Sequence, residues 1–523
     1  MNYVLTIDEG TTSTRALLID AQGKILDIVQ KEITQYYPQP GWVEHDATEI
    51  WDKTLACCRE LIKQNLDACK INKDSIKSIA ITNQRETTIV WNPRSGKPIH
   101  NAIVWQCRRT SDRCKELSKT KIGNIDFTDY IKAKTGLIPD AYFSATKLEW
   151  ILNNRQTNAE AGQSCPLLFG TIDTWLVWNL SLGRAHLTEP SNASRTMLYD
   201  INENKWDEEI LKTLNIDKLM LRDVIDCNGD FNSSPLFQDL TDQELPIKAV
   251  LGDQQAALYA YDNQAKCTYG TGTFVMIPQK SSWRGADATR QTSLKSKIGE
   301  ERDSMSFSLA TNNDGLLKST AYRTNSSQAF ALEGSIFIGG SIVQWLRDEL
   351  KFIDKSADIE ALANEVSDNG GVYLIPALAG LGAPFWDGDV RGTIFGITRG
   401  SNKAHIARAA LESIAYRVRD VFEALDPGLR KSITKLNVDG GASLNDTLMQ
   451  FQADLLQIPI QRYTETEMTA LGVAKMTGDI KLKLKAEKIF EPHKSFEKEY
   501  SEWGKYLNLL LRGKTSEIHR TSD

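Results

Sequence analysis

Two stretches, one in each half of the chain, repeat one pattern: a turn of glycine and hydroxyl residues beside apolar, β-branched runs. The first turn, Asp8–Thr14, lies between the apolar runs Val4–Ile7 and Ala16–Ile19. The second turn, Tyr269–Gly272, leads into the apolar run Thr273–Ile277. Such a turn suits a polyphosphate, because backbone N–H groups and hydroxyls donate hydrogen bonds to its oxygens. One such turn can equally be a solvated hairpin loop, but two in this order indicate a duplicated nucleotide-binding domain.

Charged residues at the first turn fit the same kind of ligand. The turn takes seven residues, more than a two-residue hairpin of the Asn-Gly or Asp-Gly type needs. Arg15 would supply positive charge to a phosphate. Asp8 would hold a metal ion through water.

The composition excludes several classes of protein. The 523 residues are too many for one hydrophobic core, so two domains are expected. The 62 Lys and Arg residues against 68 Asp and Glu give a net charge of −6, which provides no basic surface for nucleic acid or an anionic membrane. No apolar run reaches the roughly 18 residues that span a bilayer, and no signal peptide is expected.

The cysteines and histidines argue against a zinc centre. None of the eight cysteines forms a Cys-x-x-Cys pair, so they indicate buried thiols of a reducing, cytoplasmic compartment. The six histidines show no spacing typical of zinc ligands, so no zinc site is expected.

Polar residues follow several of the expected strands. The run Ile76–Ile81 leads into Asn83–Thr88, and Pro246–Val250 leads through Gly252 into Asp253 and a helical pattern. In open α/β sheets, ligands bind at this edge. Asp253 is therefore either a helix cap or a general base that faces a cleft.

The rest of the chain alternates between short apolar runs and helical patterns. The longer helices are expected at Asp46–Asn65, with Asp46 as its cap, at Tyr142–Ile151, Lys403–Leu425, Asn445–Leu456 and Thr466–Met476. The polar stretch Ser281–Asn313 predicts a long loop. Lys481–Arg512 is expected to be a charged helical tail.

These stretches together resemble the FGGY carbohydrate kinases, and among them the members that act on glycerol. Pro40–Asp46, Asn83–Thr88 and Ala102–Gln106 are similar to the glycerol-specific members in particular. Tyr142–Trp150 and Gly392–Glu412 are similar to the two signature stretches of the family. The family's order is completed by Gly252–Gln255, Tyr269–Gly272 and Asp439–Ala442. The resemblance covers almost the whole chain.

The resemblance implies an α/β fold of two actin-like (ribonuclease H-like) domains, each a mixed five-stranded sheet with flanking helices, closing over a cleft. We expect residues 1–260 to form the domain with the glycerol site and catalytic base, and residues 261–523 the domain with the nucleotide site. The implied reaction uses ATP and Mg²⁺ to convert glycerol into sn-glycerol 3-phosphate, for glycerol uptake and catabolism. The transfer would be in-line, with an aspartate general base. The family often forms homodimers or homotetramers.

The resemblance also assigns residues to each ligand. Those implied for glycerol are Arg85, Glu86, Trp105, Tyr142, Asp253, Gln254 and Phe274, with Asp253 as the catalytic base. Those implied for the nucleotide are Thr11, Thr12, Ser13, Arg15, Thr271, Gly340, Gln344, Gly441 and Asn445. Asp8 and Asp253 are implied for the metal. The residue types suit a triol, because Arg85 donates and Glu86 accepts hydrogen bonds while aromatic faces cover the carbon edge.

One residue departs from the family pattern, and two other functions stay open. Glu9 stands where the family usually has glutamine, so it is expected to point away from the triphosphate or to arrange metal-bound water. One alternative is a family member that acts on a pentulose or on a polyol such as erythritol. The other is a non-catalytic nucleotide switch, like actin or the heat-shock ATPases. Arg85, Glu86 and Trp105 favour glycerol, and Asp253 favours an enzyme.

Overall fold

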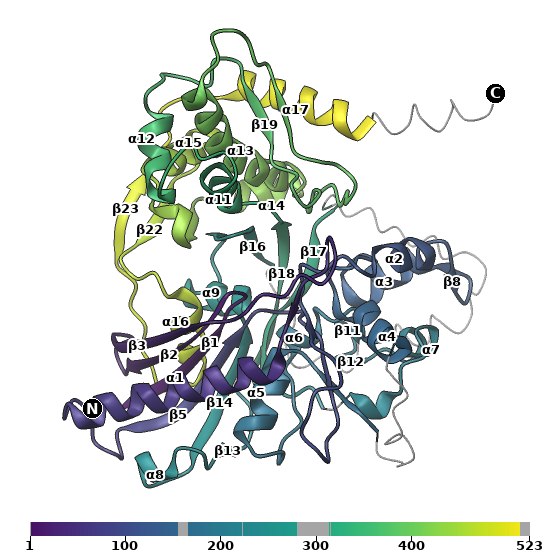
Figure 1. The fold of residues 1–523 in the computed structure, drawn as a ribbon, viewed down its shortest axis with the longest axis vertical. Helices are drawn as coiled ribbons and strands as arrows, with labels where there is room; N and C mark the ends of the chain where they lie inside the picture. The colour runs from purple at the N-terminus through teal and green to yellow at the C-terminus, as the bar shows by residue number, and fades with distance from the viewer. Residues whose placement is uncertain (1, 155–165, 222, 280–312, 314, 513–523) are drawn as a thin grey trace.

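The computed structural model describes residues 2–154, 166–221, 223–279, 313 and 315–512. Each half of the chain centres on a mixed β-sheet, and helices surround both sheets (Figure 1). Residues 281–312 of the expected long loop lie outside the described part of the chain. None of the helices in the described part combines the length and the apolar character that a membrane span requires.

The first sheet is built on the hairpins of the opening stretch. Its strands, in spatial order, are β13 (Ser233–Ser234), β14 (Leu245–Gly252), β5 (Ile76–Asn83), β1 (Tyr3–Glu9), β2 (Ser13–Asp20) and β3 (Ile25–Glu32). β1, β2 and β3 are antiparallel, whereas β5 and β14 run parallel to β1. Helices α1 (Ala47–Asp67) and α5 (Ile172–Leu180) pack on one face of the sheet, and α9 (Asp253–Ala260) and α16 (Met468–Met476) on the other.

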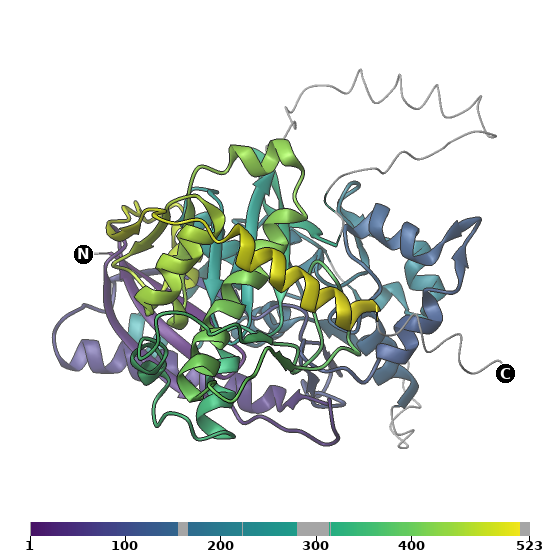
Figure 2. The same cartoon turned by 90° about the horizontal axis from the view of Figure 1, so that it is seen from above.

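The second sheet has seven strands. In spatial order they are β17 (Leu317–Thr324), β18 (Ser327–Ile336), β16 (Thr273–Gln279), β15 (Lys266–Tyr269), β21 (Leu436–Asp439), β22 (Ile460–Tyr463) and β23 (Ala486–Phe490). Its helices are α11 (Ser341–Asp348), α12 (Ile359–Ala363), α13 (Lys403–Glu423), α14 (Pro427–Ser432), α15 (Asp446–Leu456) and α17 (Glu497–Arg512). Figure 2 shows α17 lying across the helices of this half, where Trp503 stacks on Tyr416 of α13 with ring centroids 5.0 Å apart.

The two sheets share one topology, as the repeated turns predicted. In each, two antiparallel neighbours follow the first strand on one side and two parallel strands lie on the other. In the second half the corresponding strands are β15, β16, β18, β21 and β22. The five expected strands are therefore present in both halves. β13 extends the first sheet, and β17 and β23 extend the second.

The opening turn is shorter than the seven residues expected. Asp8 and Glu9 already pair with Arg15 and Thr14 in the β1–β2 ladder. Only Gly10–Thr12 lies outside the strands, and the Gly10 N–H closes the turn by donating to the Ser13 carbonyl over 2.9 Å. Asp8 and Arg15 consequently stand opposite each other on neighbouring strands.

The prediction of a helical tail over Lys481–Arg512 is wrong for its first part. Residues Ala486–Phe490 form the edge strand β23, antiparallel to β22, and the helix begins only at Glu497. The charged residues of this strand face outward while Phe490 is buried in the core of the second half. β22 would otherwise leave an unpaired sheet edge, and β23 satisfies its backbone groups.

The first half carries a large insertion beside its sheet, drawn in blue in Figure 1. Its helices are α2 (Ser111–Leu117), α3 (Phe127–Thr135), α4 (Ser144–Asn154), α6 (Pro190–Ala193) and α7 (Glu208–Thr213), whereas α8 (Gln238–Thr241) lies between β13 and β14 of the first sheet. Its short strands are β4 (Glu44–His45), β6 (Ile89–Trp91), β7 (Ala102–Ile103), β8 (Lys121–Ile122), β9 (Ile125–Asp126), β10 (Leu168–Gly170), β11 (Tyr199–Asp200) and β12 (Lys205–Trp206). In the second half, β19 (Tyr373–Ile375) pairs with β20 (Thr393–Phe395). The insertion has its own hydrophobic core, which includes Trp105 and Tyr142.

Candidate active site

A cavity of about 470 Å³, here called the glycine-lined cavity, lies in the second half. Its lining includes Thr271, Gly340, Gln344, Gly441 and Asn445, all of them residues that the resemblance assigned to the nucleotide. Apolar side chains complete the wall, namely Val343, Ile359, Leu411, Ala442 and Leu444. A cavity with apolar walls and a few polar groups suits a flat, polar-edged ligand such as a purine base.

The backbone around the second turn requires glycine at one of these positions, Gly340, and beside another, Gly441. A Cβ atom on Gly340 would come within 2.9 Å of the Gly270 carbonyl oxygen, whose hydrogen bond from the Gly340 N–H is 2.8 Å long. Gly440, next to Gly441, has a φ of +85°, which side-chain-bearing residues rarely adopt. The N-terminus of α11 is thereby held against the turn, where backbone N–H groups can meet a phosphate.

A smaller cavity of about 150 Å³, here called the aromatic cavity, lies between the two halves. Trp105 and Tyr142 line it from the first half, and Thr271 and Phe337 from the second. The ring centroids of Trp105 and Tyr142 are 5.6 Å apart, and those of Trp105 and Phe274 are 6.1 Å apart. Thr271 lines both cavities, so a ligand in one would meet a ligand in the other at this residue.

A buried cluster of charges joins the two halves beside the aromatic cavity. Arg85, at the end of β5, donates from both η nitrogens to the carboxylate of Glu333 on β18, over 2.6 and 3.0 Å. Arg195 donates from Nε to Glu86 over 2.5 Å, and its guanidinium carbon lies 5.2 Å from the centre of the Tyr142 ring. Burial raises the pKa of Glu86, and the two arginines oppose that rise. Arg85 and Glu86 are thus already engaged with protein charges.

Asp253 is placed to face this cluster rather than to cap a helix. Gly252 holds the N-cap position of α9, and Asp253 is its first residue. The Asp253 Oδ1 atom lies 3.1 Å from Nε of Arg85, and its side chain is 29% exposed. Burial raises the pKa of Asp253, and Arg85 opposes that rise. Its carboxylate is therefore reachable and close to the predicted substrate residues.

Gln254 is oriented by a buried lysine. Its Oε1 atom accepts a 2.5 Å hydrogen bond from Nζ of Lys266, which also donates to the hydroxyl of Thr268 over 2.7 Å. Its Nε2 atom donates to Asp253 over 3.2 Å. Burial lowers the pKa of Lys266, and nearby carboxylates oppose that change. The lysine fixes which end of the Gln254 amide points toward Asp253.

The opening turn contributes differently from what was expected. Arg15 donates to Asp8 over 2.5 Å and to Glu467, which precedes α16, over 2.5 Å. Both of its η nitrogens thus contact carboxylates. Thr11 accepts a hydrogen bond from Trp105, and neither Thr12 nor Ser13 lines either cavity. Asp8 also accepts from the Thr469 hydroxyl over 2.9 Å.

The comparisons with known proteins show the family of the chain. Family models described as the N-terminal and C-terminal domains of the FGGY family of carbohydrate kinases match residues 3–260 and 265–478. The chain belongs to the FGGY family of carbohydrate kinases. It is 44% identical to the glycerol kinase of Fusobacterium nucleatum, over 98% of this chain and 99% of that protein. It is 46% identical to the glycerol kinase of Petrotoga mobilis, over 91% of this chain and 89% of that protein.

Solved structures of a glycerol kinase and a xylulose kinase have the same fold. Plasmodium falciparum glycerol kinase with ADP matches with a TM-score of 0.78 and 30% identity, covering 98% of each chain. A ligand-bound xylulose kinase from Lactobacillus acidophilus matches with a TM-score of 0.77 and 20% identity, covering 99% of each chain. The second likeness bears on the fold alone.

Glu9, the departure from the FGGY pattern, points away from the cleft. Alternate residues of β1 face opposite sides of the sheet, so Glu9 lies on the α1 side and Asp8 on the α16 side. Glu9 is fully buried, and the side chains of Thr14 and Gln84 beside it make no hydrogen bond of normal geometry to its carboxyl group. Burial raises its pKa well above the ordinary value. Burial thus favours the neutral form of Glu9, which is close in shape to glutamine.

Sequence reasoning missed four residues of this candidate site. Glu333 had a signal, since it is an acid within the mostly apolar run Ala329–Ile336, where a buried charge requires a partner. Phe337 follows the same run. Arg195 and Lys266 had no such signal, because each stands in an ordinary mixed stretch and its role depends on contacts across the fold.

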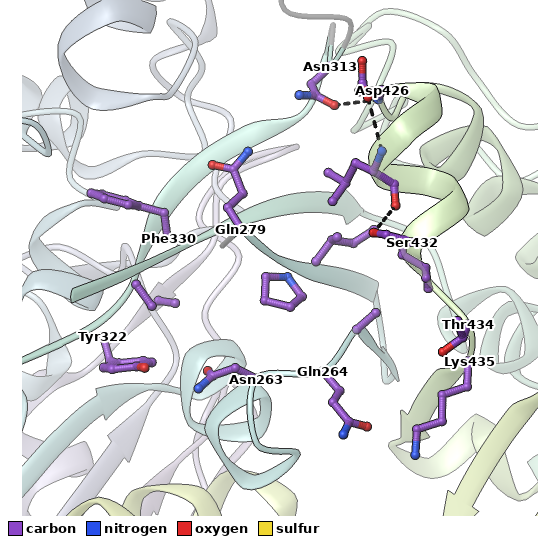
Figure 3. Close-up of a pocket in the computed structure, with 17 residues that line it drawn as sticks. Asn263, Gln264, Gln279, Asn313, Tyr322, Phe330, Asp426, Ser432, Thr434 and Lys435 are labelled. Atoms are coloured by element: carbon purple, nitrogen blue, oxygen red, sulfur yellow. Dashed lines mark hydrogen bonds between the residues drawn. The ribbon is translucent and has the colours of Figure 1, made fainter. Parts of the chain in front are cut away.

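Another cavity, of about 1010 Å³, contains none of the predicted site residues (Figure 3). It lies between β17, β18 and α14, and its rim includes Asn263, Asp426 and Lys435. A choice of site by cavity size alone would therefore have missed the residues that the family resemblance assigns to the ligands.

Proposed function

We propose that this FGGY kinase transfers the γ-phosphoryl group of ATP to glycerol, giving sn-glycerol 3-phosphate and ADP. The observation that carries the proposal is Thr271, which lines both the glycine-lined cavity and the aromatic cavity. The glycerol kinases that match nearly the full length of the chain support glycerol as the acceptor. A phosphoryl donor in one cavity and a polyol in the other would place their reacting atoms next to one another.

Glycerol would bind between the aromatic rings and the buried charge cluster. Trp105, Tyr142 and Phe274 would cover its carbon edge. Its hydroxyls would form hydrogen bonds with the Asp253 and Glu86 carboxylates and with the Nε edge of the Arg85 guanidinium. A site that satisfies hydroxyls with buried polar groups discriminates strongly against analogues that lack one.

ATP would occupy the glycine-lined cavity, with its phosphates directed toward Thr271. The residues proposed for it are Thr11, Thr12, Ser13, Arg15, Thr271, Gly340, Gln344, Gly441 and Asn445. Thr271 would donate to the transferring phosphoryl group. Phosphoryl transfer requires mainly in-line placement and donors for the equatorial oxygens, which these backbone and hydroxyl groups provide.

Asp253 would accept the proton of the attacking hydroxyl. Its carboxylate is partly exposed and has an ion pair with Arg85 at 3.1 Å. Positioned general bases of this kind contribute about 10²- to 10⁴-fold to the rate. The base would be oriented by Arg85 from the first half, while the donor is bound by the second.

The site fits a magnesium ion held through few protein ligands. The described residues contain no group of three or more His, Cys, Asp or Glu side chains that could hold a metal. Asp8 and Asp253 supply the hard carboxylate oxygens that Mg²⁺ prefers, and the ion is commonly bound by one or two carboxylates with phosphates and water. Bound there, it would neutralise charge on the β- and γ-phosphates.

The experiment is coupled ADP release with Mg-ATP and a panel of glycerol, dihydroxyacetone, erythritol, xylulose and ribulose at matched concentrations. Turnover that depends strongly on glycerol is expected. Turnover on a pentulose alone would show that the aromatic cavity binds a pentulose in place of glycerol. ATP binding without turnover on any polyol would favour a nucleotide switch. Light scattering would test the proposed homodimer or homotetramer, and fractionation of cells the cytoplasmic location.

A further inference from the structure

We propose that Glu333 is a positioning residue for the acceptor substrate, reaching from the second half to hold Arg85 so that Asp253 stays available. The inference rests on the proposed function, because it assigns Arg85 and Asp253 to glycerol. No residue of β18 was assigned to the site from the sequence. Glu333 would make the first half's substrate site depend on the second half.

Glu333 is a fully buried carboxylate with four hydrogen bonds. It stands inside β18, opposite Met276 of β16 and Leu317 of β17. One oxygen accepts from Nη1 of Arg85, and the other from Nη2 of Arg85, Nη2 of Arg195 and the hydroxyl of Ser335. Its pKa is lowered to about 2, since the two guanidinium groups outweigh burial. Glu333 is therefore a charged residue of the second half that is bound by two arginines of the first half.

The cluster contains more carboxylates than guanidinium groups. Glu86 accepts a hydrogen bond from Nε of Arg195, and Glu333 accepts from both η nitrogens of Arg85, a bidentate fork. Asp253 is left with the Nε edge of Arg85 at 3.1 Å, a pairing that leaves its side chain 29% exposed. A bidentate fork is the strongest pairing that a guanidinium makes, so the carboxylate that holds it decides the orientation of Arg85.

Removal of the Glu333 charge would release that fork. Buried guanidinium groups are costly without a carboxylate partner, so Arg85 would turn to the nearest one. Asp253 is that neighbour, and a fork on Asp253 would occupy the oxygens that glycerol and its proton need. The loss would therefore fall on the acceptor side of the reaction and not on nucleotide binding.

The test is the Glu333→Gln variant of the full chain, which keeps the shape and removes the charge. We expect kcat/KM for glycerol to fall by about 30-fold or more, with kcat itself reduced, as for loss of an interaction needed in the transition state. The dissociation constant for ADP should change by less than about two-fold. Glu333→Asp keeps the charge and should recover part of the lost activity. Wild-type glycerol kinetics in folded Glu333→Gln, or an equal loss of ADP affinity, would overturn the inference.

Two further variants separate positioning from loosening of the interface. Asp226→Asn removes the negative charge from the 2.6 Å contact with Arg323 of β17, another link between the halves, and should leave glycerol kinetics within about two-fold of wild type. If Glu333→Gln fails to fold, Glu333→Asp and Ser335→Ala test the inference in its place, since both disturb the same carboxylate. An unchanged kcat/KM for glycerol in both variants would refute the role of Glu333. A wild-type protein with no glycerol-dependent turnover would instead contradict the proposed function.

Discussion

The indole Nε1 of Trp105 donates a hydrogen bond to the hydroxyl oxygen of Thr11 over 3.0 Å. Trp105 walls the aromatic cavity, and Thr11 lies in the opening turn. The bond therefore fixes the proposed glycerol site relative to a turn proposed to bind phosphate. Because the bond joins these two loops, its loss should affect binding at both sites.

Trp105→Phe keeps an aromatic wall, of smaller size, and removes the donor. A typical buried hydrogen bond is worth about 1 kcal/mol, so kcat/KM for glycerol should fall about five-fold. Thr11→Val removes the acceptor with little change in shape. If the bond carries the effect, the double variant should lose little more than either single variant, whereas independent losses would multiply. Steady-state kinetics of the three variants measure this.

Glu9→Gln should make the protein more stable at neutral pH. The pKa of Glu9 is raised in the folded state, so the folded protein binds this proton more tightly than the unfolded chain. The associated stability is present below the ordinary pKa of 4.5 and is lost as pH rises toward the raised value. Glutamine does not titrate. The difference in free energy of unfolding between Glu9→Gln and wild type should therefore grow from pH 5 to pH 8.

Denaturant unfolding at several pH values measures that difference. A gap that stays constant across this pH range would show that Glu9 is ionised in the folded protein. Glu32→Gln, on the outer strand β3, serves as a matched control, since this side chain lies at the surface and should give no pH-dependent gap of that size.

Gly472 marks the crossing of α9 and α16 and should not tolerate a side chain. A Cβ atom there would lie 1.8 Å from the Ala256 carbonyl oxygen, so the two helices would have to separate. Overpacking of this kind costs about 1–3 kcal/mol or more, and Gly472→Ala should lower the melting temperature accordingly. Gly504→Ala in α17 is the control, because a Cβ there meets no atom within 4 Å and alanine favours a helix. Equal melting temperatures for Gly472→Ala and wild type would contradict the close crossing.

Much of the fold could be predicted from local sequence. Asp46 before an amphipathic run predicted α1, and its carboxylate accepts hydrogen bonds from the Thr48 and Glu49 N–H groups. The repeated turns predicted the duplicated topology. β23 could not be predicted in this way, because Ala486–Phe490 has a composition common in helices and becomes a strand only where β22 offers an unpaired edge.

The candidate site was predictable only where a short motif carries it. The residues of the glycine-lined cavity come from turns with a clear pattern, such as Thr271 and Gly441. The charge cluster comes from such motifs only in part, because Arg85 and Glu86 lie in one short stretch whereas their partner Glu333 lies 248 positions from Arg85 in the chain. Arg15 was assigned to phosphate from its charge, yet its partners Asp8 and Glu467 depend on the ladder and on α16.

The most direct test of the account is the Asp253→Asn variant, measured for glycerol-dependent ADP release and for binding of both substrates. Asparagine keeps the shape and cannot accept the hydroxyl proton. The account predicts that turnover falls by about 10²-fold or more, while calorimetry still detects ADP and glycerol. Turnover close to wild type in Asp253→Asn would contradict Asp253 as the base and, with it, the proposed arrangement of the site.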